Sequence, residues 1–156
     1  MTPDDAAAVA RMAGELSAHE GVAAPPFDAD SVRRWGFGPD RRFDGVVAEL
    51  GGRVVGYALY HDGFHVGRGT PGVMLMDLYA EPSARRRGVG RALMTAVAEA
   101  ARRRGGTWVV WQVHPDNVEG LAFYRALGAR RYRAADFELE LAAHRSGGPN
   151  SRGDHA

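Results

Sequence analysis

The sequence predicts an α/β protein of the α+β kind, built on a mixed sheet with helices on its faces. Segments with the 3.6-residue period of helices alternate with short apolar runs typical of strands, in the order α-α-β-β-β-α-β-α-β-β. Two adjacent glycines, Gly51 and Gly52, separate two strand runs and indicate a tight hairpin. A length of 156 residues with 45% hydrophobic residues suits one domain with one core.

The N-terminal part predicts two helices. The first begins at a cap formed by Thr2 or Asp4, continues to about Ala18, and ends at Gly21. After the break at Pro25-Pro26, a short second helix begins at a cap formed by Asp28 or Asp30. It runs through Val32 and Trp35 and ends within residues 36–39.

Three strands are expected next. Residues 45–50 and 53–60 flank the paired glycines, which suit the positive φ angles of a hairpin turn. The polar, Gly-rich residues 61–72 are expected to form a loop. Residues 73–80 form an apolar run with one carboxylate, Asp77, and this predicts a central strand buried on both faces.

The second half predicts a helix, a strand, a second helix and a final pair of strands. In order, these are a loop at 82–87, a helix at 88–104, a strand at 107–113, a helix from Asp116 or Asn117 to Gly128, and strands at 130–133 and 137–141. Residues 1–143 are therefore expected to form the single domain. Residues 144–156 are rich in small and polar side chains, and we expect this tail to be disordered.

Composition excludes several kinds of chemistry. All 20 basic residues are arginine, so mechanisms that need a lysine are excluded. The chain has no cysteine, which excludes disulfides, a thiolate nucleophile and cysteine-ligated metals. The net charge of +1 gives no electrostatic reason to expect nucleic acid or a membrane as a partner. With no apolar run near 20 residues and no signal-like N-terminus, we expect a soluble cytoplasmic protein.

The segment from Arg85 to Met94 has the features of an anion site. Its pattern R-x-x-G-x-G lies between a buried strand and a helix, where backbone N–H groups are unpaired and the helix dipole is positive. Gly88 and Gly90 lack a Cβ atom, so a pyrophosphate can approach the backbone. Four arginines add charge: Arg85, Arg86, Arg87 and Arg91. The alternatives are an ordinary tight loop with a solvated basic face, or a dinucleotide fingerprint, for which the third glycine is missing.

These residues resemble a known family. Arg85-x-x-Gly88-x-Gly90, preceded by an apolar strand, is similar to the acyl-CoA-binding signature of the GNAT acetyltransferase superfamily. A second signature, from Asn117 through Ala122-Phe123-Tyr124 to Leu127-Gly128-Ala129, resembles the downstream helix of that family. Within the superfamily the chain looks most like the diamine (spermidine/spermine-type) acetyltransferases, on residues 75–79, 111–117 and 16–20.

The resemblance implies the GNAT acyl-CoA N-acyltransferase fold, with a mostly antiparallel sheet, helices on both faces and a splayed central strand pair. It implies acetyl-CoA as cosubstrate and no metal. Pantetheine would pair with Leu78, Tyr79 and Ala80 and contact Asn117. Pyrophosphate would lie on Gly88, Val89, Gly90 and Arg91, near Arg85 and Arg86. Tyr124 would protonate the departing thiolate, although a core aromatic is the alternative.

The general base is the point at which the sequence departs from the family. Met76 stands where the diamine acetyltransferases have glutamate, and a thioether cannot take a proton. Asp77 is retained as a candidate base or amine anchor, although strict alternation would place it on the strand face opposite Met76. Further candidates for contacting the substrate are Glu20, His61, His114 and Asp136. Residues 61–68 hold one acid and one arginine, which weakens the case for a polyamine.

The sequence thus predicts an N-acetyltransferase that moves acetyl from acetyl-CoA to a primary amine of a small molecule. Without cysteine, direct attack in a ternary complex is favoured over a covalent acyl-enzyme. Two alternatives stay open: a protein or peptide N-acetyltransferase, and a non-catalytic acyl-CoA-binding regulatory module. Family members usually open with a strand, and here Met1 lies almost at the helix cap. Either that strand is absent or the true start lies upstream. An absent strand would leave a sheet edge to be covered by a second copy, and we expect a homodimer.

Overall fold

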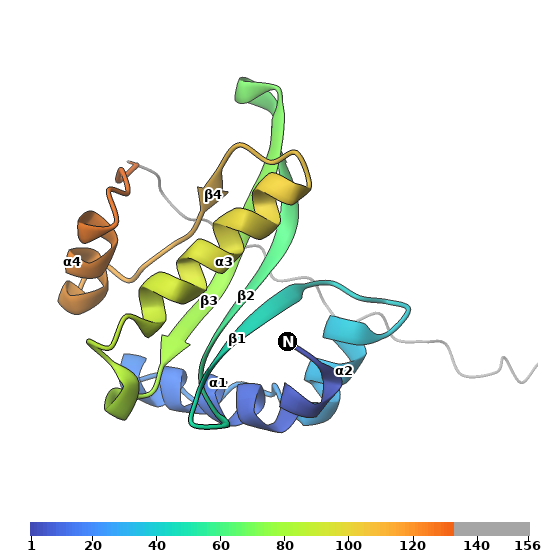
Figure 1. Cartoon of the computed structure of the whole chain (residues 1–156), viewed down its shortest axis with the longest axis vertical. Coiled ribbons are helices and arrows are strands. Elements are labelled where there is room, and N and C mark those ends of the chain that lie inside the picture. The colour runs from blue at the N-terminus through green and yellow to red at the C-terminus, as the bar shows by residue number, and fades with distance from the viewer. Residues whose placement is uncertain (133–156) are drawn as a thin grey trace, which may run out of the picture.

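A computed structural model describes residues 1–132 and contains one four-stranded sheet of order β1-β2-β3-β4 (Figure 1). The first three strands are antiparallel neighbours, and β4 runs parallel to β3. The elements are α1 (Ala6–Glu20), α2 (Ala29–Phe37), β1 (Asp44–Leu50), β2 (Arg53–His65), β3 (Thr70–Ala80), α3 (Val89–Arg103), β4 (Val109–Val110) and α4 (Val118–Ala126), with short 3₁₀ turns at Pro3–Asp5, Val66–Arg68 and Pro82–Ala84. The mixed sheet with helices on both faces confirms the predicted fold class.

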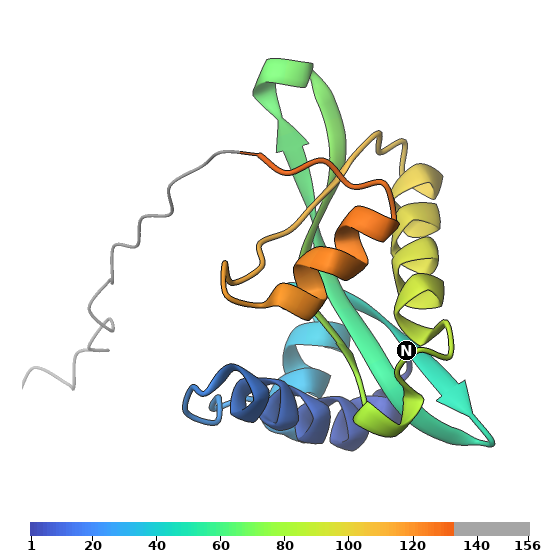
Figure 2. The same cartoon turned by 90° about the vertical axis from the view of Figure 1, so that its left-hand side faces the viewer.

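Helices cover both faces of the sheet. Helix α3 lies on one side of the strands and α1 on the other, as Figure 2 shows. Each side has its own apolar cluster: Leu93 and Val97 of α3 pack on one, and Val9 and Met12 of α1 on the other. Alternate side chains of β2 enter the two clusters, because successive residues of a strand point to opposite faces. The core is therefore divided into two layers by the sheet.

The signals for the end of α1, the start of α2 and the first hairpin are confirmed, whereas α1 begins only at Ala6, after a 3₁₀ turn that Thr2 caps. Helix α1 ends at Gly21, which has a left-handed φ of 71°. The Asp28 side chain accepts a 2.8 Å hydrogen bond from the Ser31 amide at the start of α2. Gly51 and Gly52 have φ values of 60° and 76°, which only glycine adopts without strain.

The loop expected at residues 61–72 is wrong. Strand β2 continues to His65 and β3 already begins at Thr70, so the two form a long hairpin that extends beyond the body (Figures 1 and 2). The glycines that suggested a loop are explained by a close neighbour. A Cβ atom at Gly63 would lie 2.9 Å from the Trp108 ring, and one at Gly72 would lie 2.2 Å from it. These glycines let the indole approach the hairpin backbone.

Strand β4 is shorter than expected. Residues 107–113 were expected to be a strand, but only Val109 and Val110 pair with β3, opposite Val73 and Met74. Beyond this point the chain leaves the sheet toward α4 (Figure 1). The two central strands therefore part after Met74 and Val110, as the family resemblance implied. From Leu75 onward, no strand within residues 1–132 pairs with β3 on that side.

A β-bulge interrupts β3 just beyond the parting point. Leu59 pairs with Asp77 and Tyr60 with Leu75, so Met76 is the extra residue. Leu75 packs with the α3-side cluster, whereas Asp77 bonds to Tyr57 of the α1-side cluster. Strict alternation therefore does not hold here. Met76 is 53% exposed, so the expectation of a strand buried on both faces is wrong at this residue.

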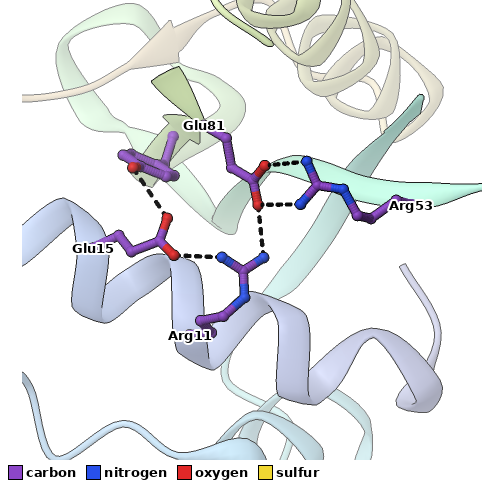
Figure 3. A network of polar contacts seen from close by, with 5 residues as sticks. Arg11, Glu15, Arg53 and Glu81 are labelled. Atoms are coloured by element: carbon purple, nitrogen blue, oxygen red, sulfur yellow. Dashed lines mark hydrogen bonds and ion pairs between the residues drawn. The ribbon is translucent and has the colours of Figure 1, made fainter. Parts of the chain in front are cut away.

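An ionic network ties α1 to the end of β3 (Figure 3). Glu81, 6% exposed, accepts hydrogen bonds from both terminal nitrogens of Arg53, at 3.0 and 2.7 Å, and from Arg11 at 2.8 Å. Arg11 also pairs with Glu15, whose other oxygen accepts a 3.2 Å bond from the Tyr79 hydroxyl. The network fixes the point where the chain leaves β3 for the turn before α3.

The last predicted elements fall largely beyond the described part of the chain. Residues 130–132 belong to no strand within the described part of the chain, and their predicted partner at 137–141 lies outside it. The strand at 137–141, the domain boundary at 143 and the tail at 144–156 lie outside the described residues. Within residues 1–132, no helix is both long and apolar enough to cross a membrane. No cluster of three or more histidine, aspartate or glutamate side chains in that range is arranged to hold a metal.

Candidate active site

The turn before α3 presents unpaired backbone donors. Gly88 caps the helix with a left-handed φ of 82°, and the first helical bond runs from the Ala92 amide to the Gly88 carbonyl. The amides of Val89, Gly90 and Arg91 therefore have no intrahelical acceptor. Arg86 also has a positive φ, 57°, which is uncommon outside glycine and marks this turn as strained. Together with the helix dipole, the turn suits a phosphate group.

The arginines of this turn differ in their contacts. Arg85 donates a 3.2 Å hydrogen bond to the Ala80 carbonyl and lies 3.7 Å from a Glu119 oxygen. Arg91 donates a 3.4 Å bond to the Ala126 carbonyl. Arg86 and Arg87 are exposed. Arg85 and Arg91 thus join the turn to α4, while Arg86 and Arg87 are free of such contacts within the described residues and are available to bind a phosphate.

Gly90 has a packing role that the sequence did not reveal. A Cβ atom there would lie 3.1 Å from the Phe123 ring of α4. Without a side chain at Gly90, α4 packs closely against the first turn of α3. The neighbouring Gly88 has open space around its Cβ position, so only its backbone angle explains the glycine there.

Asn117 caps α4. Its side-chain oxygen accepts a 2.8 Å hydrogen bond from the Gly120 amide. A Cβ atom at Gly120 would lie 2.9 Å from that side chain, so the glycine makes room for the cap. The oxygen of Asn117 is thereby committed to the helix, and its NH₂ group is the part able to bind a cofactor carbonyl.

Tyr124 lies in an aromatic cluster beside the parted strands. Its ring centroid is 4.9 Å from that of Trp111 and 5.1 Å from that of Phe123. Burial raises the pKa of Tyr124 to about 12, and the charges of Asp77 and Glu20 contribute to the rise. The hydroxyl therefore carries its proton throughout the neutral range. Tyr124 and the two carboxylates share one electrostatic environment, although they come from α4, β3 and α1.

Asp77 is held by a residue that the sequence did not single out. The Tyr57 hydroxyl donates a 3.0 Å hydrogen bond to Oδ2 of Asp77, and Tyr57 is fully buried. Burial raises the pKa of Asp77, the bond from Tyr57 lowers it, and the charge of Glu20 raises it. In the sequence, Tyr57 is one of several apolar and aromatic residues in a strand run, and nothing there distinguishes it.

A cleft of about 470 Å³ brings the end of α1 to the loop before α4. Its lining residues are His19, Glu20, His114, Asp116, Asn117, Val118 and Glu119. Two predicted substrate contacts, Glu20 and His114, therefore lie in one cleft, next to the predicted cofactor contact Asn117. The sequence analysis missed His19, Asp116 and Glu119, because only the fold brings residues 19 and 20 to the loop at 114–119.

The other two predicted substrate contacts do not join this cleft. His61 lies on β2 opposite Met74, with its Nδ1 2.9 Å from the Asp62 carbonyl oxygen, and is not among the lining residues. Asp136 lies outside the described residues. Among the predicted cofactor contacts, Leu78 and Ala80 are half-buried on the side of β3 that packs with α3, and Tyr79 lies on the α1 side.

Comparison with known proteins identifies the family. The profile of the Acetyltransferase (GNAT) family matches residues 12–129. A thialysine N-epsilon-acetyltransferase from Bos taurus is 28% identical over 141 residues, covering 85% of this chain and 82% of that protein. An L-ornithine N5-acetyltransferase from Arabidopsis thaliana is 32% identical over 97 residues, covering 62% of this chain and 40% of that protein.

The fold is also found among solved structures. An aminoglycoside acetyltransferase from an uncultured soil metagenomic sample superposes with a TM-score of 0.74 at 19% identity, covering 91% of this chain and 93% of that one. At this identity the superposition supports the fold alone.

Proposed function

The chain belongs to the GNAT acetyltransferase family, and we propose that it transfers acetyl from acetyl-CoA to the side-chain amine of a small diamino compound. One observation carries this proposal. Where β3 and β4 part, the Tyr124 ring packs on Trp111, and the charges of Asp77 and Glu20 act on its hydroxyl, so a proton donor and two carboxylates lie within electrostatic range of one another. A proton donor for a leaving thiolate and an acceptor for an ammonium proton are the two groups this reaction needs.

The residues of the turn and of the parted strand fit acetyl-CoA. The free amides of Val89, Gly90 and Arg91 would hold its pyrophosphate, with Arg86 beside them. The open edge of β3 at Leu78 and Ala80 would pair with the pantetheine amides, and the NH₂ group of Asn117 would bind from the other side. When bound, acetyl-CoA supplies an activated thioester carbonyl.

The chain's own groups manage the protons. A primary amine is mostly protonated at neutral pH, so one proton must leave before nitrogen can attack. Asp77 is the half-buried carboxylate next to the gap and replaces the missing glutamate at Met76. Tyr124 holds the proton that a departing thiolate needs. A bound ammonium beside Asp77 would offset the negative charge that raises the pKa of Tyr124. The pKa of Tyr124 would then lie closer to that of the departing thiol.

Charge favours a cationic substrate in the cleft. Its lining contains three carboxylates, those of Glu20, Asp116 and Glu119. These carboxylates attract an ammonium group to the cleft. The relatives named for thialysine and ornithine support a diamino acid, whose second ammonium would lie among these carboxylates.

A free-thiol release assay tests the proposal. The protein is given acetyl-CoA with ornithine, thialysine, 2,4-diaminobutyrate, spermidine, an aminoglycoside or a peptide with a free N-terminus. We expect amine-dependent thiol release to be fastest with a diamino acid, and a mass increase of one acetyl group on its side-chain nitrogen. Preference for the peptide would indicate a protein acetyltransferase. Tight CoA binding without transfer to any amine would indicate a regulatory module. Either result would overturn the proposal.

We also propose that two copies associate. Strand β1 is the outermost strand on its side of the sheet within residues 1–132 and is paired only with β2, so its other edge is available for pairing. Sedimentation equilibrium at micromolar concentration should give twice the 16.8 kDa mass of the chain, and a single-chain mass would contradict the proposal.

A further inference from the structure

The β-bulge at Met76 changes which residues meet at the gap. Because Met76 is the extra residue, Leu75 and Asp77 lie on opposite faces although they are two positions apart. Without the bulge, Asp77 would share the α3-side face with Leu75. With it, the carboxylate lies on the side of α1, where the buried Tyr57 and the end of α1 are its neighbours.

The contact between Tyr57 and Asp77 is asymmetric. The hydroxyl donates to Oδ2 only, and within residues 1–132 Oδ1 makes no hydrogen bond. Tyr57 is 0% exposed, so its hydroxyl is cut off from solvent and its ring is fixed by packing against Tyr79, with centroids 6.5 Å apart. A donor that is fixed in this way holds the carboxylate in one orientation.

We propose that Tyr57 is a positioning residue of the acetyl transfer: it fixes Asp77 through Oδ2, so that Oδ1 accepts the proton that the substrate ammonium loses. This inference rests on the proposed function. In the reaction, one ammonium proton passes to Oδ1 of Asp77. The nitrogen lone pair then forms the C–N bond, and the C–S bond breaks. Tyr124 protonates the sulfur and is reprotonated by the proton that the new amide nitrogen releases. The proton on Asp77 leaves to solvent.

The charged and titratable groups around Asp77 come from several elements. Glu20 of α1 is the other carboxylate, and Tyr124 of α4 lies within reach of the charges of both. Tyr57 of β2 is the hydrogen-bond donor. On β3 itself, Tyr79 donates to Glu15 instead. Among residues 1–132, only Tyr57 therefore stabilises the ionised form of Asp77 through a direct bond, and this bond opposes burial and the charge of Glu20.

The test compares the pH dependence of kcat/KM in the wild type, Tyr57→Phe and Asp77→Asn. Removing the hydroxyl takes one donor from ionised Asp77, so its pKa rises and the acid limb of the profile moves up by about one pH unit. Above the limb, the loss of positioning should lower kcat of Tyr57→Phe by about tenfold, with an unchanged KM for acetyl-CoA. Asp77→Asn should lose about 10²-fold in kcat.

Two controls test whether the acid limb of the profile belongs to Asp77. Tyr60→Phe makes the same change on the opposite face of the same strand, and its acid limb should not move. Repeating the profile with an amine of lower pKa identifies a limb that belongs to the substrate, because such a limb moves with the amine and a limb from Asp77 does not. In parallel, carboxyl NMR of ¹³C-labelled aspartate should show the Asp77 signal titrating at higher pH in Tyr57→Phe.

Each outcome decides the inference. The inference is supported if the acid limb of the kcat/KM profile and the NMR signal of Asp77 both move to higher pH in Tyr57→Phe, and neither moves in Tyr60→Phe. An acid limb that stays in place in Tyr57→Phe, or a limb that moves in Glu20→Gln but not in Tyr57→Phe, overturns it and leaves the proposed function intact. A wild type that acetylates no amine of the panel overturns the proposed function, and the positioning role of Tyr57 with it.

Discussion

Tyr124 combines two properties that oppose each other in catalysis. Its burial keeps the hydroxyl protonated, because the pKa is raised to about 12, but an acid with so high a pKa gives up its proton less readily. In the proposed reaction the substrate arrives as a cation next to Asp77 and Glu20, and its charge lowers the pKa of Tyr124 again. Tyr124 is therefore expected to act only in the ternary complex.

Removal of the Tyr124 hydroxyl should affect catalysis more than binding. We expect Tyr124→Phe to lower kcat by about 10²-fold or more, since general acids are typically worth 10²–10⁴. The dissociation constant of acetyl-CoA, measured by calorimetry, should stay within about threefold. Tyr132→Phe is the matched control, because Tyr132 is 51% exposed and bonds only to Arg68 and Arg130 within the described residues. A loss below about tenfold in Tyr124→Phe would remove it as the acid.

Sequence patterns located some site residues and not others. Tyr124 and Asn117 were predictable because they occupy one helix at a family spacing. Tyr57 was not, because its partner lies 20 residues away on the neighbouring strand and the bulge at Met76 decides which face Asp77 takes. A bulge leaves no mark in the alternation of an apolar run such as residues 73–80.

The element that controls the cofactor turn is the end of β3. Glu81 is the last residue before the turn, and its amide donates a 2.9 Å bond to the Val55 carbonyl. The hydrogen bond from Arg53 lowers the pKa of Glu81 most, and that from Arg11 adds to the effect. Sheet and first helix are thus joined where the anion-binding turn starts.

Glu81→Gln should loosen this junction. The carboxylate charge is removed from three hydrogen bonds, two with Arg53 and one with Arg11, but both arginines are half-exposed and regain water. We therefore expect the free energy of unfolding in urea to fall by about 1 kcal/mol at pH 7. Because the folded pKa of Glu81 lies below its unfolded value, the wild-type advantage should be complete above the unfolded pKa and vanish as pH falls through the folded one. Glu99→Gln, whose pair with Arg103 spans 4.0 Å on the surface, should change stability little. Equal losses in both variants would contradict a special role for Glu81.

The β2–β3 hairpin explains where element prediction failed. Helix caps and the Gly51-Gly52 turn were predictable because their signals lie within a few residues. The long hairpin was not, because Gly63 and Gly72 accommodate Trp108, which is 36 or more residues away in the sequence. Likewise, the apolar run at 107–113 matches a strand, but Trp111 packs on Tyr124 of α4 and the chain leaves the sheet there.

At the scale of the whole molecule, tyrosines dominate the response to alkali. Burial is the main cause of a raised pKa at four of the five tyrosines: Tyr57, Tyr60, Tyr79 and Tyr124. Lysine and cysteine, which would titrate in the same range, are absent from the chain, and arginine stays charged. Tyrosine ionisation is therefore the main titration between about pH 9 and pH 12.

Stability should consequently fall above pH 10. The unfolded chain releases tyrosine protons near pH 10, whereas the folded protein retains them, so the unfolded state binds fewer protons and the free energy of unfolding decreases. Each tyrosine proton that the folded protein retains lowers the free energy of unfolding by about 1.4 kcal/mol per pH unit. Urea unfolding from pH 8 to pH 11, with tyrosinate absorbance at 295 nm, measures this. Tyr57→Phe should reduce the slope, and a flat profile up to pH 11 would contradict the burial of these hydroxyls.

The parting of β3 from β4 also predicts an uneven exchange of backbone hydrogens with solvent. Strand β3 is bonded to β2 along its length but meets β4 only at Val73 and Met74. Between residues 77 and 80 of β3, backbone amides that point to β2 should exchange slowly, whereas amides that point to the gap should exchange within seconds. Slow and fast amides should therefore alternate along this part of the strand. A ligand that completes the sheet would erase this alternation, so deuterium uptake along one strand would report cofactor occupancy without any measurement of turnover.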